Sequence, residues 1–177
     1  MRKLIEYTLI TLDGVIGEPT RWSNFDEESA ALALKRLDDF DAYVMGRAGY
    51  EYVFSGLSES EGNPYLERLK AMPKYVASRS LSAPPPNVTL LGPDVADAIR
   101  KLKEQPGKDL IKYGTSRLDA LLLDERLLDE LHLWYIPVVV GAGQRLFESV
   151  GASALKLRMI DECRLTNGSV VLSYAVL

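Results

Sequence analysis

The chain contains only one cysteine, Cys163, and one histidine, His132, among 177 residues. A single cysteine excludes an internal disulfide framework, and so few soft ligands argue against a zinc-type site. No apolar run approaches the ~20 residues that a membrane-spanning helix needs. The net charge is −4, so the chain lacks the basic excess typical of nucleic-acid binding. We therefore expect a soluble, cytoplasmic protein whose partner is a small molecule, not nucleic acid or a membrane.

The composition is that of a globular protein, with 47% hydrophobic residues. Its length fits a single domain over residues 1–177. Apolar periodicity predicts helices over residues 28–40 and 94–104. Asn167-Gly168 lies between two alternating runs near the end of the chain and predicts an antiparallel hairpin. We expect one α/β domain with a mixed sheet, helices on both faces and an antiparallel C-terminal hairpin.

Glycine, hydroxyl side chains and arginine follow several predicted strands. The strand-like run that starts at Leu4 is broken by Asp13-Gly14, and later runs end at Gly46-Arg47, at Ser78-Arg79 and at Gly114-Thr115-Ser116. Each motif alone fits an ordinary helix cap. Together they favour a phosphate site at the carboxyl edge of a sheet, because helix N-termini offer free N–H groups and arginine grips phosphate with a planar fork.

The stretch LWYIPVVVGAGQRLF, residues 133–147, combines a β-branched run with two close glycines. Val138, Val139 and Val140 fit a strand that is covered on both faces. Gly141 and Gly143 remove side chains where another group approaches. That group is either a neighbouring element of the fold or a ligand, and the pattern alone favours packing or turn geometry.

The order of these motifs resembles a known superfamily. DGVIG, MGRxxYE, SR after a strand, GTSRL and LLDELHLWYIPVVVGAGQRLF are similar to the dihydrofolate reductase-like superfamily. Within it, nearly the whole chain resembles the C-terminal reductase domain of the bacterial bifunctional deaminase-reductase of riboflavin biosynthesis, in a stand-alone form without the zinc motif of a deaminase. The resemblance implies a homodimer and hydride transfer from a nicotinamide cofactor.

The resemblance also assigns cofactor-binding residues. Arg79 beside a 2′-phosphate implies NADPH instead of NADH. The implied contacts are Gly46 and Arg47 at the phosphates, Ser78 and Arg79 at the 2′-phosphate, Gly114, Thr115 and Ser116 around the pyrophosphate, Val15 and Ile16 at the nicotinamide, and Gly141 and Gly143 where backbone approaches the cofactor. The chain departs from the family pattern at Ala48-Gly49, which lacks a threonine, and at Thr115, which replaces a second glycine.

Catalytic and substrate-binding residues are harder to assign. Asp13 and Glu27 are candidate acids, because reduction requires a proton from an acid or an ordered water. Trp22 and Asp26 resemble the pterin-binding segment of true dihydrofolate reductases, although consecutive acids also suit a first helical turn and Asp-Gly suits a turn. Two alternatives to a reductase of small heterocycles, imines or carbonyls stay open: a non-catalytic nucleotide- or ligand-binding protein, and a dihydrofolate reductase.

Overall fold

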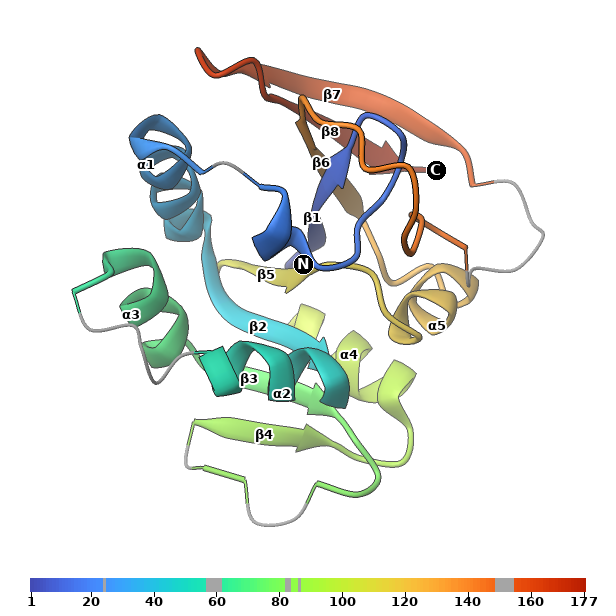
Figure 1. Ribbon diagram of the computed structural model, residues 1–177. Coiled ribbons are helices and arrows are strands. Elements are labelled where there is room, and N and C mark those ends of the chain that lie inside the picture. Colours follow the sequence, from blue (N-terminus) through green and yellow to red (C-terminus); the bar gives the residue numbers. More distant parts are fainter. Residues whose placement is uncertain (24, 57–61, 82–83, 86, 149–154) are drawn as a thin grey trace.

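The computed structural model describes residues 1–23, 25–56, 62–81, 84–85, 87–148 and 155–177 (Figure 1). One eight-stranded sheet organises them, in the order β4-β3-β2-β5-β1-β6-β8-β7. The first six strands in that order are parallel, and β8 is antiparallel to both β6 and β7. The strands are β1 Leu4–Thr11, β2 Phe40–Gly46, β3 Lys74–Ala77, β4 Val88–Leu91, β5 Asp109–Tyr113, β6 Glu130–Ile136, β7 Leu157–Arg164 and β8 Val170–Val176.

Helices cover both faces of this sheet, as the sequence predicts. Figure 1 shows α2 and α3 in front of the parallel strands and α4 behind them. Side chains of α4 and α5 pack in one core cluster, whereas Leu37 and Leu69 belong to a cluster on the other face. The helical elements are η1 Pro19–Arg21, α1 Glu27–Arg36, η2 Leu37–Asp39, α2 Arg47–Gly56, α3 Pro64–Ala71, α4 Val95–Glu104 and α5 Leu118–Asp124.

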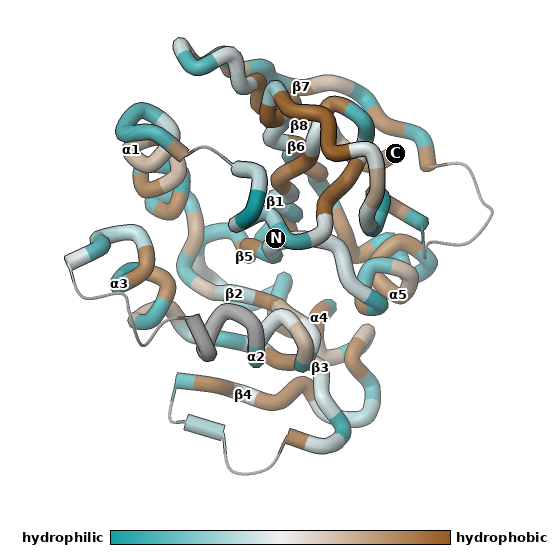
Figure 2. The backbone as a smooth tube through the Cα atoms, in the orientation of Figure 1, coloured by the Kyte–Doolittle hydropathy of each residue, from teal (hydrophilic) through white to brown (hydrophobic). Residues whose placement is uncertain are grey.

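The hydrophobic residues of the chain follow the strands. In Figure 2 hydrophobic stretches of the tube lie along strands such as β4 and along the loop after β6, and α1 shows both hydrophilic and hydrophobic turns. In β1, Leu4 packs with the α4 and α5 cluster and the next residue, Ile5, packs with the opposite cluster. This alternation buries both faces of the strand. Among the described residues, no helix has the length and apolarity that crossing a membrane requires.

Two local predictions need correction. Residues 28–40 are not one helix: α1 is followed by the short helix η2, and Phe40 begins β2. The three valines do not form a covered strand, because β6 ends at Ile136 and Val139 is 66% exposed. Pro137 follows at that point and has no N–H to continue the ladder. The predicted hairpin is confirmed, with Gly168 at φ 86° between β7 and β8.

Candidate cofactor and substrate cleft

The carboxyl ends of the parallel strands gather the predicted cofactor motifs at one edge of the sheet. Gly46 pairs with Ala77, so Arg47 and Ser78 emerge side by side from β2 and β3. Tyr43 pairs with Ile111, which brings Gly46 level with Gly114 after β5. A Cβ atom added at Gly46 would lie 4.0 Å from the Ser116 hydroxyl. Gly46, Arg47, Ser78, Arg79, Gly114, Thr115 and Ser116 therefore share this edge.

Arg47 connects the start of α2 with the turn after β3. Its Nε donates to Glu51 Oε1 at 2.7 Å, and its Nη1 donates to the Ser80 hydroxyl. The Ser78 hydroxyl oxygen accepts a bond from the Leu81 N–H at 3.0 Å. Arg79, in contrast, is exposed and makes no hydrogen bond or ion pair with any other described residue. Arg79 borders a cavity of ≈ 720 Å³, here called the edge cavity, which is lined also by residues 92–96.

The Gly114–Ser116 turn presents groups that a ligand could bind. Gly114 has φ 65°, the left-handed conformation that glycine adopts most easily. The Thr115 hydroxyl is buried and has no hydrogen-bond partner in the part of the chain that the structure describes. Below the turn, Lys112 Nζ donates to the Gly114 carbonyl, and the Ser116 N–H donates to Asp119. The turn is thus held from inside the protein while its outer surface lines a cavity.

Lys112 belongs to a buried charged cluster with Glu6 and Asp119. Lys112 Nζ lies 3.0 Å from Glu6 Oε2 and 2.5 Å from Asp119 Oδ1, and all three side chains are fully buried. Burial raises the pKa of Glu6 to about 7, although Lys112 opposes this shift. Sequence reasoning missed the cluster. A lysine and a glutamate within apolar strands are the signal that could have found it, since Glu6 and Lys112 are register partners of β1 and β5.

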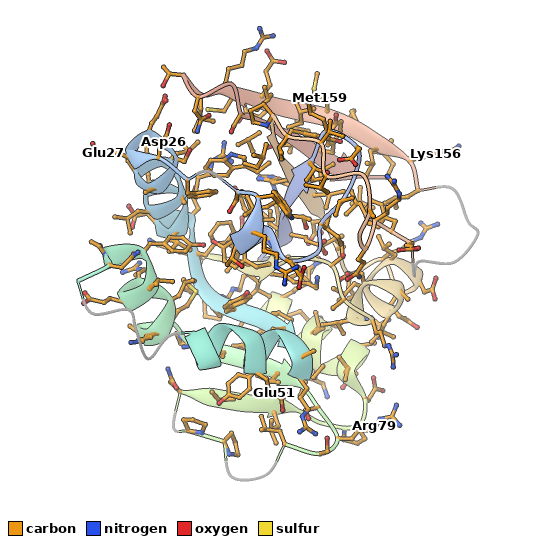
Figure 3. All side chains as sticks on the ribbon, viewed as in Figure 1. Asp26, Glu27, Glu51, Arg79, Lys156 and Met159 are labelled. Carbon is orange, nitrogen blue, oxygen red and sulfur yellow. The ribbon has the colours of Figure 1, made fainter. Side chains whose placement is uncertain are left out.

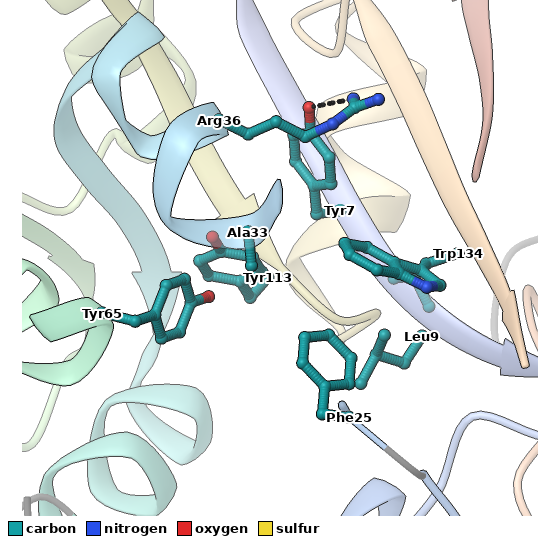
Figure 4. Close-up of a pocket in the computed structure, with 9 residues that line it drawn as sticks. Tyr7, Leu9, Phe25, Ala33, Arg36, Tyr65, Tyr113 and Trp134 are labelled. Carbon is teal, nitrogen blue, oxygen red and sulfur yellow. Dashed lines mark hydrogen bonds between the residues drawn. The ribbon is translucent and has the colours of Figure 1, made fainter. Parts of the chain in front are cut away.

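Two adjoining cavities form the cleft between β1, β5 and the loops above them. The outer cavity, ≈ 340 Å³, is bordered by Ile16, Ala48, Gly114, Thr115 and Gln144. The inner cavity, ≈ 100 Å³, is shown in Figure 4. It is lined by Tyr7, Thr8, Leu9, Phe25, Ala33, Arg36, Tyr65, Tyr113 and Trp134. The two cavities share Tyr7, Thr8, Leu9 and Tyr113, so ligands in them would be neighbours.

Asp13 connects the loop after β1 with the loop after β6 at the rim of the cleft. Its carboxylate accepts bonds from the Thr11 hydroxyl at 2.6 Å and from the Gly141 N–H at 2.8 Å. The Thr11 hydrogen bond, aided by the Gly141 and Val140 N–H groups, lowers the pKa of Asp13. Asp13 is therefore held as a carboxylate, which is a poor proton donor at neutral pH.

The predicted glycine pair has a packing role at Gly143. At φ 144°, a Cβ there would lie 2.6 Å from Val15 Cγ1, whereas a Cβ at Gly141 would meet open space. Val15 is buried under this loop and borders, with Gly143, a separate side cavity of ≈ 520 Å³. Of the two residues predicted at the nicotinamide, only Ile16 lines the outer cavity.

Neither the residues predicted to bind substrate, Trp22 and Asp26, nor the candidate catalytic acid Glu27 lines either cavity of the cleft. Trp22 borders the side cavity and donates from Nε1 to the Gly17 carbonyl at 2.8 Å. Asp26 caps α1 and accepts the Ser29 N–H at 2.8 Å. Glu27 is exposed in the first turn of that helix. Figure 3 shows Asp26 and Glu27 at the outer end of α1, far from Arg79.

The fold and the cleft define a reductase-like α/β domain. The chain belongs to the RibD C-terminal domain family, whose model matches residues 2–171. It is similar over 98% of its length to the uncharacterized protein YyaP of Bacillus subtilis, at 28% identity and with 94% of that protein covered.

Solved structures support the same fold. One is the Thermotoga maritima diaminohydroxyphosphoribosylaminopyrimidine deaminase/5-amino-6-(5-phosphoribosylamino)uracil reductase, with a TM-score of 0.70 and 16% identity over 99% of this chain and 57% of that one. Another is the Schistosoma mansoni dihydrofolate reductase, with a TM-score of 0.60 and 16% identity over 99% of each chain. The chain therefore has the dihydrofolate reductase-like fold that its motifs predict.

Proposed function

We propose that the protein is an NADPH-dependent reductase that transfers a hydride to a small heterocyclic, imine or carbonyl substrate. The observation that carries the proposal is the Gly114–Ser116 turn, in which Thr115 lines the outer cavity and its buried hydroxyl has no hydrogen-bond partner among the described residues. Buried polar atoms in proteins nearly always have a partner, and rotation of this hydroxyl toward the cavity would let a polar ligand supply one. Thr115 belongs to the turn that the family resemblance assigns to a pyrophosphate.

The residues along the sheet edge offer suitable groups for the phosphates and the 2′-phosphate of a dinucleotide. The N–H groups at the start of α2, after Gly46, suit phosphate oxygens. Arg79, which has no protein partner among the described residues, suits the 2′-phosphate that distinguishes NADPH from NADH. When bound, NADPH would supply the hydride. Ile16 and the Gly114 turn would confine the reacting ring within the outer cavity, next to a substrate in the inner one.

The reaction also needs a proton. Since Asp13 is held as a carboxylate by its hydrogen bonds, we assign proton delivery to an ordered water in the cleft instead of to this side chain. The substrate of the Thermotoga maritima reductase, 5-amino-6-(5-phosphoribosylamino)uracil, is one compound to test for turnover.

A titration with NADPH and NADH tests the cofactor assignment, with the fluorescence of Trp22 and Trp134 as the readout. We expect wild type to prefer NADPH and Arg79→Ala to lose about tenfold or more in NADPH affinity, because a charge-assisted contact to phosphate disappears, while NADH binding is unchanged. Arg158→Ala is the matched control, since Arg158 is an exposed arginine on β7.

The same titration separates the alternatives. Binding of neither dinucleotide would refute the reductase proposal and favour a non-catalytic protein that binds another ligand. Binding of NADPH without any effect of Arg79→Ala would refute the role of that arginine. A separate titration with an antifolate tests the third alternative: tight binding that is lost in Asp26→Asn would support a dihydrofolate reductase.

A further inference from the structure

The inner cavity has a volume suited to one aromatic ring. Its volume of ≈ 100 Å³ is about that of a single aromatic ring. Five aromatic side chains form most of its wall, and Figure 4 shows them arranged around the cavity: Tyr7, Phe25, Tyr65, Tyr113 and Trp134. Aromatic walls favour planar conjugated ligands through stacking and edge-to-face contacts.

Among the described residues that line this cavity, Arg36 is the only charged one. Its Nη1 donates to the Tyr7 hydroxyl oxygen at 2.9 Å, and its guanidinium carbon lies 5.7 Å from the centre of the Tyr7 ring. Among the described residues it forms no ion pair with a carboxylate. A guanidinium has five N–H donors, so donors remain for a ligand. Asp161 attracts Arg36 only from beyond ion-pair distance, and a half-buried cation without a direct ion pair carries a desolvation cost that a bound anion would offset.

Tyr7 can add a donor of its own. Burial raises the pKa of Tyr7 even though Arg36 opposes the shift, so the hydroxyl stays protonated at neutral pH. Its oxygen accepts the Arg36 bond, which leaves its O–H free to donate. No acidic side chain is among the described residues that line the inner cavity, so a cationic ring would find no carboxylate counter-ion there.

We infer that the inner cavity binds a planar conjugated ring bearing an acidic group, and that Arg36 and Tyr7 receive that group. The inference names the substrate class of the proposed reductase and so rests on that proposed function. The ring would lie against Tyr113, one of the residues shared with the outer cavity, and would face the cofactor there. An arginine also binds carboxylates and phosphates better than a lysine would, because its fork is planar.

Three probes of one shape test the charge preference: benzoate is anionic, benzamide is neutral and benzamidine is cationic. We expect wild type to bind benzoate about tenfold more tightly than benzamide, as a charge-assisted contact provides, and benzamidine least. Arg36→Gln should lower the affinity for benzoate to that for benzamide. Saturation-transfer NMR and quenching of Trp134 fluorescence measure binding, and Arg158→Gln is the matched control.

Each outcome bears on the inference. Benzamidine as the tightest ligand, no binding of benzoate, or an unchanged order in Arg36→Gln would overturn it. Tyr7→Phe is a second variant that keeps the arginine, and we expect a smaller but selective loss for benzoate. NADPH affinity, measured on the same samples, tests the reductase proposal alone. If benzoate binds through Arg36 but NADPH does not bind, the proposed anion site stands and the proposed reductase function is refuted.

Discussion

Glu6 gives the stability of this protein a specific dependence on pH. Burial raises its pKa from 4.5 to about 7 in the folded protein, whereas the unfolded chain keeps the ordinary value. Between these two pKa values the folded protein holds a proton on Glu6 that the unfolded chain has released. The stabilisation from this group is therefore complete below pH ~4.5 and is lost as the pH rises through ~7. We expect Glu6→Gln to gain up to roughly 3 kcal/mol relative to wild type between pH 5 and pH 8.

Urea unfolding at several pH values measures this gain. Glu104→Gln is the control, because Glu104 is an exposed residue of α4. A constant difference between Glu6→Gln and wild type from pH 5 to pH 8 would show that Glu6 does not titrate in this range.

The sequence identifies residue types at the site more readily than their roles. The motifs predict which backbone turns meet at the sheet edge, because parallel strands share their carboxyl ends. Whether Asp13 donates a proton or clamps a loop depends on Gly141, which lies 128 residues further along the chain. Arg36 escapes sequence reasoning for the same reason: one arginine at the end of an amphipathic helix looks like an ordinary solvated residue until Tyr7 is placed beside it.

At the scale of elements, the loops after β1 and β6 form a single paired unit. Ile16 N–H donates to the Gln144 carbonyl at 2.9 Å, and Leu146 N–H donates to the Gly14 carbonyl at 3.1 Å. Gly143 lets the two loops approach, because a Cβ there would collide with Val15. The prediction of a close approach is confirmed at Gly143, where the nearest group is a side chain of this protein, and is wrong at Gly141, where an added Cβ would meet open space.

Alanine substitutions test this unit. Gly143→Ala should cost about 2 to 3 kcal/mol of stability, since both the positive φ and the clash oppose it. Gly141→Ala is the matched control and should cost about 1 kcal/mol, because it has a positive φ but open space. Urea unfolding measures both, and Val15→Ala combined with Gly143→Ala should recover part of the loss. Equal losses at the two glycines, without coupling to Val15, would contradict the clash.

At the scale of the whole molecule, the sheet order determines which strand is left at the edge. Local patterns predict the strands and the hairpin. The order of the strands in the sheet depends instead on long-range pairing, which places β1 between β5 and β6. That order leaves β7 at an edge with Met159 54% and Ile160 40% exposed. The register of β7 against β8 shifts between Met159 and Asp161. An exposed, partly apolar edge is a template for pairing with another chain.

We propose that a second copy of the chain covers this edge and makes the homodimer that the family resemblance implies. Ile160→Lys should weaken such a dimer by about tenfold or more, because a charge would be buried at the contact. Val139→Lys is the control, since Val139 is equally apolar and 66% exposed but lies in the loop after β6. Light scattering after size exclusion, over a range of concentrations, gives the mass of each protein. A monomeric wild type would refute the homodimer, and a dimer that resists Ile160→Lys would place its interface away from β7.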